Sequence, residues 1–262
     1  MIKNISFLTT HFIDFDWTSL LVKNILKYTD LLRIKEIAII NQDRTSESQM
    51  RLQGLSSLVR VLEYPCSSSH YAIQGHDHAN VLNQAIREVK GEYICLFDSD
   101  AHPTKPNWLF GCEDILNYYD AILALVPGSA INTHPCFMMM KKVCIDSSLS
   151  FDKNLFTNGI DTGRLVGMQL LNSGRRVYFA PPNKAFNGLW GDLYLNVIYH
   201  HRKASFHGSV DERIRQQVNW KNNFFKRFVV NKHRYELTMT EYLLFRFQNN
   251  IRKRFHLIKD VY

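Results

Sequence analysis

The stretch GEYICLFDSDAHPTKPNWL, residues 91–109, joins an apolar run to two carboxylates and a proline-rich turn. The run GEYICLF is apolar on both faces, which is typical of strands in parallel sheets that are covered by helices on both sides. Asp98 and Asp100 follow this strand directly. Ligands of open α/β sheets bind outside the carboxyl ends of the strands, so the sequence predicts a ligand site at these two acids.

Strand-like and helix-like patterns alternate around this stretch, which indicates an α/β chain with a doubly wound, mostly parallel sheet. Helix caps are expected near Asp16 or Thr18 for the first helix and at Asp77 for the second. The predicted elements of the N-terminal half are strands at 5–10, 36–40, 59–65 and 91–97 and helices at 17–28 and 77–90.

Composition narrows the class of protein. A chain of 262 residues can bury a sizeable core, and one main domain is the default. The net charge of +8 favours phosphates, nucleic acid or an anionic membrane surface as partners. The five cysteines form no CxxC pair, which indicates small buried residues in a reducing cytosol. The N-terminus lacks a signal-peptide pattern and no apolar run has membrane-spanning length, so a soluble or peripheral protein is expected.

The spacing of Asp98 and Asp100 fits a metal site. Two carboxylates at i and i+2 can both face one ion, or one can face an ion and the other a ribose or phosphate. Their oxygens suit Mg²⁺ or Mn²⁺, which bind through one or two carboxylates together with substrate phosphates. The alternative is that the two acids only cap the turn that follows.

Four stretches follow one another along the chain in a characteristic order. They are HANVLNQAIREVKGEYICLFDSDAHPTKPNWL (78–109), HPCFMMMKKVCIDSSLSFD (134–152), NGIDTGRLVGMQLLNSGRRVYFAP (158–181) and YHHRKAS (199–205). Their order and spacing resemble the family 2 glycosyltransferases of GT-A fold, and the resemblance extends from Ile5 to about Ser205. It implies a GT-A (Rossmann-like) domain at 1–209, built on a central mixed, mostly parallel sheet flanked by helices, with a nucleotide-binding half at 1–100 and an acceptor half at 101–209. A mainly helical extension at 210–262 would follow it.

The resemblance implies that the protein moves a sugar from a nucleotide-sugar donor to a hydroxyl of a saccharide or lipid-linked saccharide, with inversion. Asp100 would bind Mn²⁺ or Mg²⁺ at the diphosphate, and Asp98 would share the metal or contact the ribose. One of His200 and His201, which follow the strand-like run 193–199, would be a further metal ligand. The positions expected to bind the nucleotide sugar are Thr9, Asn41, Asp43, His78 and Asp98.

Asp161 matches the family's general base, which deprotonates the acceptor hydroxyl. Inverting transfer needs such a base on the face opposite the leaving diphosphate. Many members have Glu where this chain has Ile160. The alternative role of Asp161 is the N-cap of the next helix. Trp190, between two glycines, is a candidate platform for the acceptor sugar, and its alternative is packing in the core.

Two other features bear on the ligand. The family usually has Asp after the second strand, where this chain has Asn41, with Asp43 two residues on, so the nucleotide base stays open. His78 is expected near a base or phosphate, and the surrounding GHDH cluster lacks the spacing of a metal site. Met138, Met139 and Met140 are expected to fill the core rather than to bind a ligand.

The segment 210–262 mixes Lys and Arg with aromatic and aliphatic residues. This composition is typical of an interfacial helix on an anionic leaflet, which would place the enzyme in the cytoplasm at the inner face of the membrane. The alternatives are a helical appendage with a solvated basic face and a dimer contact. Nucleic acid is not expected as a partner, because no motif for it is present.

Two alternative functions remain open at this stage. One is a non-catalytic GT-A-like binding protein. The other is a nucleotidyltransferase, but the run TTHFIDFDW after the first strand does not resemble that class's glycine-rich phosphate loop.

Overall fold

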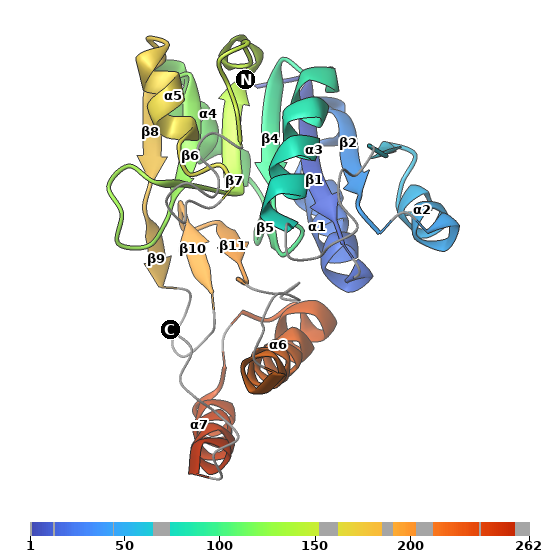
Figure 1. Cartoon of the computed structure of the whole chain (residues 1–262), viewed down its shortest axis with the longest axis vertical. Helices are drawn as coiled ribbons and strands as arrows, with labels where there is room; N and C mark the ends of the chain where they lie inside the picture. The colour runs from blue at the N-terminus through green and yellow to red at the C-terminus, as the bar shows by residue number, and fades with distance from the viewer. Residues whose placement is uncertain are drawn as a thin grey trace. The chain divides into compact units, whose positions relative to one another are not determined.

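A seven-stranded sheet is the main sheet of the computed structural model (Figure 1). The structure describes residues 2–12, 14–43, 45–64, 74–151, 162–184, 191–202, 212–235 and 237–254. In spatial order the strands are β3 (Val59–Leu62), β2 (Ile34–Asn41), β1 (Ile5–His11), β4 (Tyr93–Phe97), β7 (Thr133–Lys141), β6 (Ala121–Leu125) and β8 (Val177–Ala180).

Parallel pairing dominates this sheet. Strand β1 pairs in parallel with β2 and β4, β2 with β3, and β6 with β8. Strand β7 runs antiparallel to both of its neighbours, β4 and β6. The mixed, mostly parallel sheet predicted from the sequence is therefore confirmed, and the N-terminal end of β7 lies at the edge where β4 ends.

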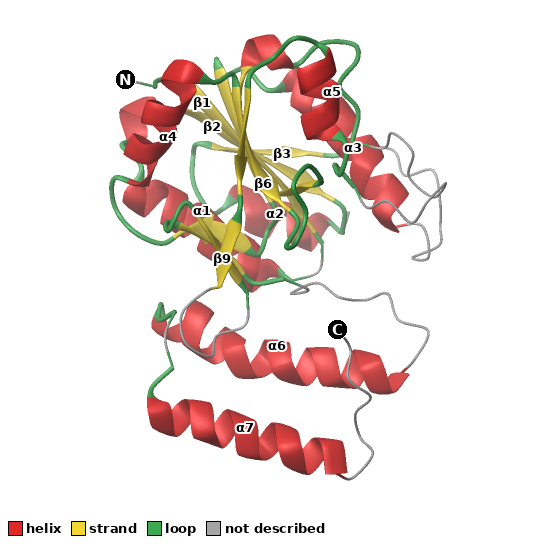
Figure 2. Ribbon diagram, turned by 90° about the vertical axis from the view of Figure 1, so that its left-hand side faces the viewer, coloured by secondary structure: helices red, strands yellow, loops and turns green. Residues whose placement is uncertain are grey.

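Helices cover both faces of the sheet (Figure 2). Helices α1 (Phe15–Tyr28) and α4 (Trp108–Tyr118) pack on one face through a core that includes Phe7, Phe97 and Trp108. Helices α3 (Gln74–Glu88) and α5 (Val166–Asn172) pack on the other face. A shorter helix, α2 (Ser46–Gln53), precedes β3, and 3₁₀ turns lie at Leu31–Arg33 and Lys142–Cys144.

Buried residues bear out the core predictions. Met138, Met139 and Met140 are fully buried in β7, as expected of core filling. The cysteines at 95, 112, 136 and 144 are free and buried, and Cys66 lies outside the described residues. Burial raises the pKa of the Cys112 thiol to about 12, which keeps it protonated and unreactive.

Three local predictions were wrong. Asp14 caps α1, where its side chain accepts a hydrogen bond from the backbone N–H of Asp16, so neither Asp16 nor Thr18 is the cap. Helix α3 begins at Gln74, which places Asp77 inside the helix rather than at its cap. The run 193–199 was expected to form one strand, but it contributes to two strands, β10 (Asp192–Tyr194) and β11 (Ile198–His200). Leu195 and Asn196 adopt positive φ and turn the chain between these strands.

The start of β4 is held tightly against β1. The backbone N–H of Gly91 donates to Ser6 Oγ at 2.7 Å, and Ser6 Oγ donates to Glu36 Oε1 at 2.8 Å. Glu36 also accepts the backbone N–H of Lys90 at 2.6 Å. A Cβ at Gly91 would lie 2.4 Å from the backbone nitrogen of Ser6, so only glycine fits this approach. The position at which β4 begins is therefore fixed, and Asp98 follows the other end of this strand.

A second sheet of four short strands continues from the turn after β4. Its order is β5 (Ala101–Pro103), β11 (Ile198–His200), β10 (Asp192–Tyr194) and β9 (Pro182–Lys184). Strand β11 runs antiparallel to β5, with His200 opposite Ala101. This pairing brings residues that are far apart in the sequence to the end of β4.

The chain divides into two compact units, Met1–Asn183 with Leu193–His200 and Lys184–Asp192 with His201–Tyr262. The second unit contains helices α6 (Glu212–Lys232) and α7 (Met239–Arg254), as predicted for a helical extension. Phe245 of α7 packs against Trp220 and Phe225 of α6, with ring centroids 5.6 Å and 4.9 Å apart. Among the described residues, no helix has the length and apolarity that crossing a bilayer requires.

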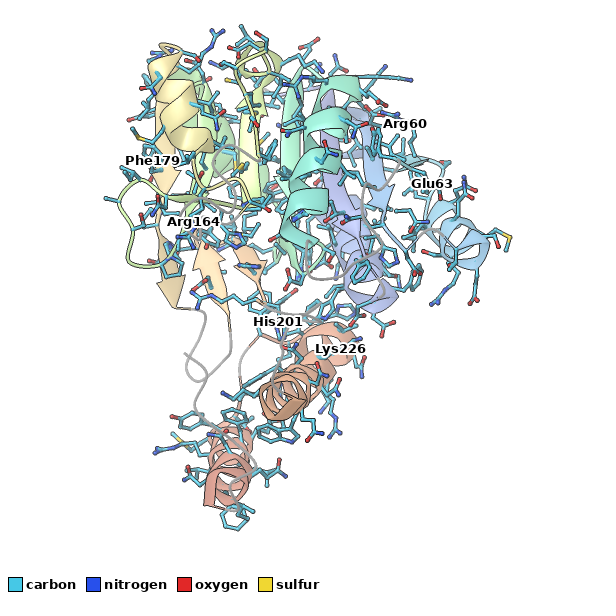
Figure 3. All side chains as sticks on the ribbon, in the orientation of Figure 1. Arg60, Glu63, Arg164, Phe179, His201 and Lys226 are labelled. Carbon is cyan, nitrogen blue, oxygen red and sulfur yellow. The ribbon has the colours of Figure 1, made fainter. Side chains whose placement is uncertain are left out.

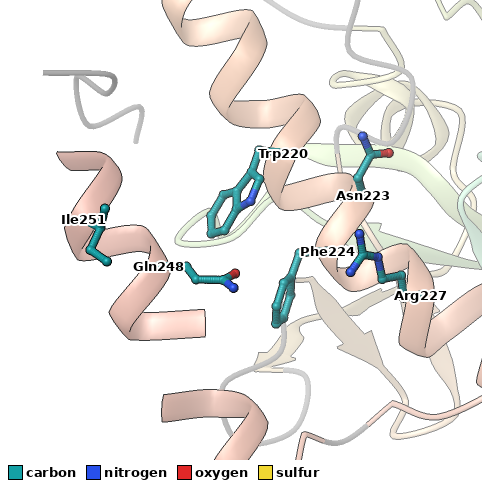
Figure 4. Close-up of a pocket in the computed structure, with 6 residues that line it drawn as sticks. All are labelled: Trp220, Asn223, Phe224, Arg227, Gln248 and Ile251. Atoms are coloured by element: carbon teal, nitrogen blue, oxygen red, sulfur yellow. The ribbon is translucent and has the colours of Figure 1, made fainter. Parts of the chain in front are cut away.

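A groove of about 410 Å³ lies between α6 and α7, lined in part by Trp220, Arg227 and Gln248 (Figure 4). The apolar residues of α7 fall into two groups. Phe245 faces α6, whereas five side chains are exposed to solvent, of which Ile251 also lines the groove: Met239, Leu243, Leu244, Phe247 and Ile251.

Candidate metal and nucleotide site

The two acids predicted to form a site lie in the turn between the two sheets. Asp98 follows β4, and Asp100 precedes β5. The backbone N–H of Ala101 donates to the carbonyl of Asp98 at 3.0 Å and closes the turn. Asp100 is buried and Asp98 is half-buried. Burial of carboxylates is costly unless a cation or hydrogen bonds compensate for it.

His200 completes a three-residue group with these acids. Its Nε2 atom lies 3.6 Å from Asp100 Oδ1 and 3.8 Å from Asp98 Oδ2. The ligand atoms of the three residues all lie within 4.8 Å of one another. These separations exceed hydrogen-bond length, and they are short enough for all three residues to reach one shared cation. The structure therefore brings together three of the four residues expected to bind metal.

The fourth residue, His201, is not part of this group among the described residues. It follows the last residue of β11 and belongs to the second unit (Figure 3). Successive side chains along an extended chain point to opposite faces, so two adjacent histidines rarely reach one ion. Of the two adjacent histidines, only His200 therefore lies next to Asp98 and Asp100 among the described residues.

His134 lies beside the same acids, and the sequence analysis did not select it. Its Nδ1 atom is 3.6 Å from Asp98 Oδ2, and its ring centroid is 5.2 Å from that of His200. His134, Cys136 and His200 form a second group of possible metal ligands. The sequence gives no local signal for this, because the contact depends on β7 running antiparallel to β4.

The residues predicted to bind the nucleotide lie at the carboxyl ends of β1 and β2 and at α3. Thr9 is buried in β1. His78 of α3 approaches the same strand, with its Nε2 atom 3.3 Å from Thr10 Oγ1. Asp43 follows β2, and its carboxylate accepts a hydrogen bond from Thr45 Oγ1 at 3.5 Å. These residues therefore lie along the same edge of the sheet as Asp98, which follows the carboxyl end of β4.

Asn41, at the end of β2, forms hydrogen bonds within the protein through both the oxygen and the nitrogen of its carboxamide. Its Oδ1 atom accepts a hydrogen bond from Ser48 Oγ at 3.1 Å. Its Nδ2 atom donates to Glu63 Oε1 at 3.3 Å, and Glu63 follows β3 on the same side (Figure 3). A bound base would have to compete for these groups, so the geometry favours a structural role for Asn41.

His11 is a second residue that the sequence analysis did not select. It ends β1 directly beside Asn41, and its Nδ1 atom lies 2.8 Å from Thr18 Oγ1. Burial lowers the pKa of His11, although Asp43 and Asp14 act in the opposite direction. The imidazole is therefore neutral at neutral pH and can both donate and accept hydrogen bonds at this edge.

Two predicted residues, Asp161 and Trp190, lie outside the described residues. The alternative proposed for Asp161, a cap on the next helix, was wrong because α5 begins at Val166 and Leu165 holds its N-cap position. The general-base role of Asp161 and the acceptor role of Trp190 stay predictions.

Comparison with known proteins identifies the fold. Neither a family model nor a curated protein matches the chain. The solved mannosyltransferase PcManGT from Pyrobaculum calidifontis, in complex with GDP-Man and Mn²⁺, aligns with a TM-score of 0.53 at 13% identity. The alignment covers 69% of this chain and 55% of that one. The chain has the GT-A fold.

A second GT-A neighbour is TarS of S. aureus, with a TM-score of 0.51 and 13% identity. It aligns with 86% of this chain but 43% of its own. This chain therefore spans about half the length of the solved GT-A proteins that it resembles. The fold predicted from the four sequence stretches is confirmed by these alignments.

Proposed function

We propose that this protein is a metal-dependent glycosyltransferase. It transfers a sugar from a nucleotide-sugar donor to a hydroxyl of a saccharide or lipid-linked saccharide. One observation carries the proposal: Asp98, Asp100 and His200 converge at the carboxyl end of β4 in a GT-A fold. The complex of PcManGT with GDP-Man and Mn²⁺ supports the same class of donor and cation.

The donor atoms of this group suit a divalent cation. Two carboxylates and one imidazole form a hard-to-borderline set that fits Mn²⁺ or Mg²⁺. When bound, such an ion neutralises the charge that develops on a departing diphosphate. Asp98 and Asp100 hold its position, because the turn that carries them is closed by the backbone bond from Ala101 to Asp98.

The other groups have separate tasks in this proposal. Asp161 deprotonates the acceptor hydroxyl from the side opposite the leaving group, which gives inversion at the transferred carbon. Trp190 supports the acceptor ring through stacking. Thr9, Asp43 and His78 contact the nucleotide, and neutral His11 contributes a further hydrogen-bonding edge beside them.

Thermal stabilisation by nucleotides tests the proposal. We expect one of UDP, dTDP, GDP, CDP and CMP to raise Tm in the presence of Mn²⁺ but not with chelator. At a ligand concentration of 100 Kd the stabilisation is about 2.7 kcal/mol. Asp100→Asn should abolish it, whereas Asp114→Asn, on the exposed side of α4, should leave it intact. A folded protein that no nucleotide stabilises with metal would refute the proposal.

A peripheral position at the cytoplasmic face of the membrane, as in assembly of lipid-linked polysaccharide, is part of the same proposal. The exposed residues of α7 support it. Met239, Leu243 and Phe247 are spaced four residues apart and so share one side of the helix. Arg246 is exposed beside them, and an apolar stripe flanked by cations is what an interfacial helix presents to anionic lipid.

Vesicle co-sedimentation tests this part separately. The wild type should bind vesicles that contain phosphatidylserine and bind neutral vesicles more weakly. The double variant Leu243→Gln/Phe247→Gln should lose binding, because it removes two exposed apolar anchors. Phe110→Gln is the matched control, since Phe110 is an exposed aromatic residue of α4. Equal binding by the double variant and the control would refute membrane contact through α7.

A further inference from the structure

Two sets of possible metal ligands share His200. One set contains Asp98 and Asp100, and the other contains His134 and Cys136. We propose that the second set, with Asp98 as fourth ligand, binds Zn²⁺ and that this binding competes with the ion at the Asp98–Asp100 set. Zinc would then switch off the nucleotide site.

The distances fit a tetrahedral ion. Ligands of a tetrahedral zinc, with bonds of about 2.0–2.3 Å, are separated from one another by about 3.3–3.6 Å. His134 Nδ1 lies 3.6 Å from Asp98 Oδ2, and His200 Nε2 lies 3.8 Å from the same oxygen. The ligand atoms of His134, Cys136 and His200 lie within 4.8 Å of one another. The ligand atoms would have to move by a few tenths of an ångström to about an ångström to reach tetrahedral separations around one ion.

The chemistry of the ligands selects the metal. A thiolate and two imidazoles prefer Zn²⁺ to Mn²⁺ or Mg²⁺, which favour oxygen. Zn²⁺ also lies well above Mn²⁺ in the general order of divalent affinities. The second set therefore has softer ligand atoms than the first. With Asp98 as its fourth ligand, it shares Asp98 and His200 with the first set.

Strand β7 positions two of the ligands rigidly. It lies inside the sheet between β4 and β6, and Cys136 is fully buried there. The backbone N–H of Cys136 donates to His134 Nδ1 at 3.1 Å, so this nitrogen carries the lone pair that a metal ligand needs. Zinc would take the place of that hydrogen bond. The S–H bond of Cys136 breaks as the S–Zn bond forms, and the proton passes to buffer.

A four-ligand zinc site leaves no open position for a diphosphate. Structural zinc sites are closed by four protein ligands, whereas catalytic sites keep one position free. With Asp98 and His200 engaged by zinc, Asp100 alone remains for the other ion. The consequence for nucleotide binding rests on the proposed function, but zinc binding itself does not.

Metal titration of the full chain tests the inference. We would measure Zn²⁺ affinity by competition with a chromophoric chelator, and ligand type by the thiolate-to-metal charge-transfer band of Co²⁺. Cys136→Ser should weaken Zn²⁺ binding by more than about tenfold and abolish the Co²⁺ band. Mn²⁺ affinity should be unchanged. Cys112→Ser, a buried cysteine of α4, is the matched control and should retain both signals.

His134→Ala provides a second variant in case Cys136→Ser fails to fold, and it should weaken Zn²⁺ binding to a similar extent. Unchanged Zn²⁺ affinity in either folded variant, or a Co²⁺ complex without the charge-transfer band, would overturn the inference. Nucleotide binding with Mn²⁺ is measured separately. Zinc binding through sulfur in a protein that binds no nucleotide would support the zinc site while refuting the proposed function.

Discussion

Replacing Gly91 with alanine should destabilise the protein strongly. Gly91 begins the segment that leads into β4, and its added Cβ would lie 2.4 Å from Ser6 N and 2.5 Å from Asn4 O. Both neighbours are backbone atoms at the start of β1, so no side-chain rotation relieves the contact. One of the two strands must move by about an ångström to restore ordinary van der Waals distances.

The magnitude follows from what this movement disrupts. Overpacking a buried site costs about 1–3 kcal/mol. The shift also lengthens the hydrogen bonds from Gly91 N to Ser6 Oγ (2.7 Å) and from Glu92 N to Asn4 O (2.8 Å). Each contributes about 1 kcal/mol. We therefore expect a loss of about 3–5 kcal/mol, a large fraction of the 5–15 kcal/mol typical of a domain, by the same principles.

Urea unfolding of Gly91→Ala and Gly111→Ala measures this effect. Gly111 lies in α4, and a Cβ there meets no atom within 4 Å. Its replacement should stabilise the protein by about 0.5–1 kcal/mol, because alanine is the better helix former. If Gly91→Ala lies within about 0.5 kcal/mol of wild type, the reasoning about close backbone approach is wrong.

Three further predictions concern charge and metal. Burial acts to raise the pKa of Glu36, but hydrogen bonds from Lys90, Ser6 and Arg60 outweigh it and lower this pKa overall. The ionised carboxylate therefore stabilises the folded protein above about pH 4.3, and this contribution is lost as the pH falls. Urea midpoints of Glu36→Gln should therefore depend less on pH in acid than those of wild type. Burial raises the pKa of Asp192, although its ion pair with Arg202 opposes this, so Arg202→Ala should destabilise more at pH 8 than at pH 5 in thermal melts. EDTA should leave the circular dichroism of the ligand-free protein unchanged, because Asp98, Asp100 and His200 are not part of the hydrophobic core, and should remove any stabilisation by nucleotide. A loss of secondary structure on chelation would contradict this.

The sequence was sufficient for features that depend on local pattern. The apolar run before Asp98 predicts a buried strand, and β4 covers Tyr93–Phe97. Because parallel strands place their ligands at one edge, the position of Asp98 and Asp100 follows from the same pattern. The contact of His200 with these acids was predicted only through the order of motifs. No local pattern predicts it, because it depends on β11 pairing with β5, about a hundred residues away.

A feature that depends on long-range pairing could not be predicted where no motif pointed to it. His134 reaches Asp98 because β7 is reversed relative to β4, and strand direction leaves no mark in the composition of a buried strand. Asn41 illustrates another limit of the sequence. The resemblance places it where the family reads the nucleotide base, and the structure adds that Ser48 and Glu63 form hydrogen bonds with its carboxamide. Partners of this kind become visible only when the tertiary structure is known.

The turn at Asp98–Asp100 passes from the large sheet to the small one, and His200 lies on a strand of the small sheet. An ion held by these residues would therefore act as a cross-link that closes a chain loop of about a hundred residues. Its binding would suppress local opening of β5 and β11, which are three residues long each. Slower amide hydrogen exchange in these two strands would make cation binding visible even without a nucleotide.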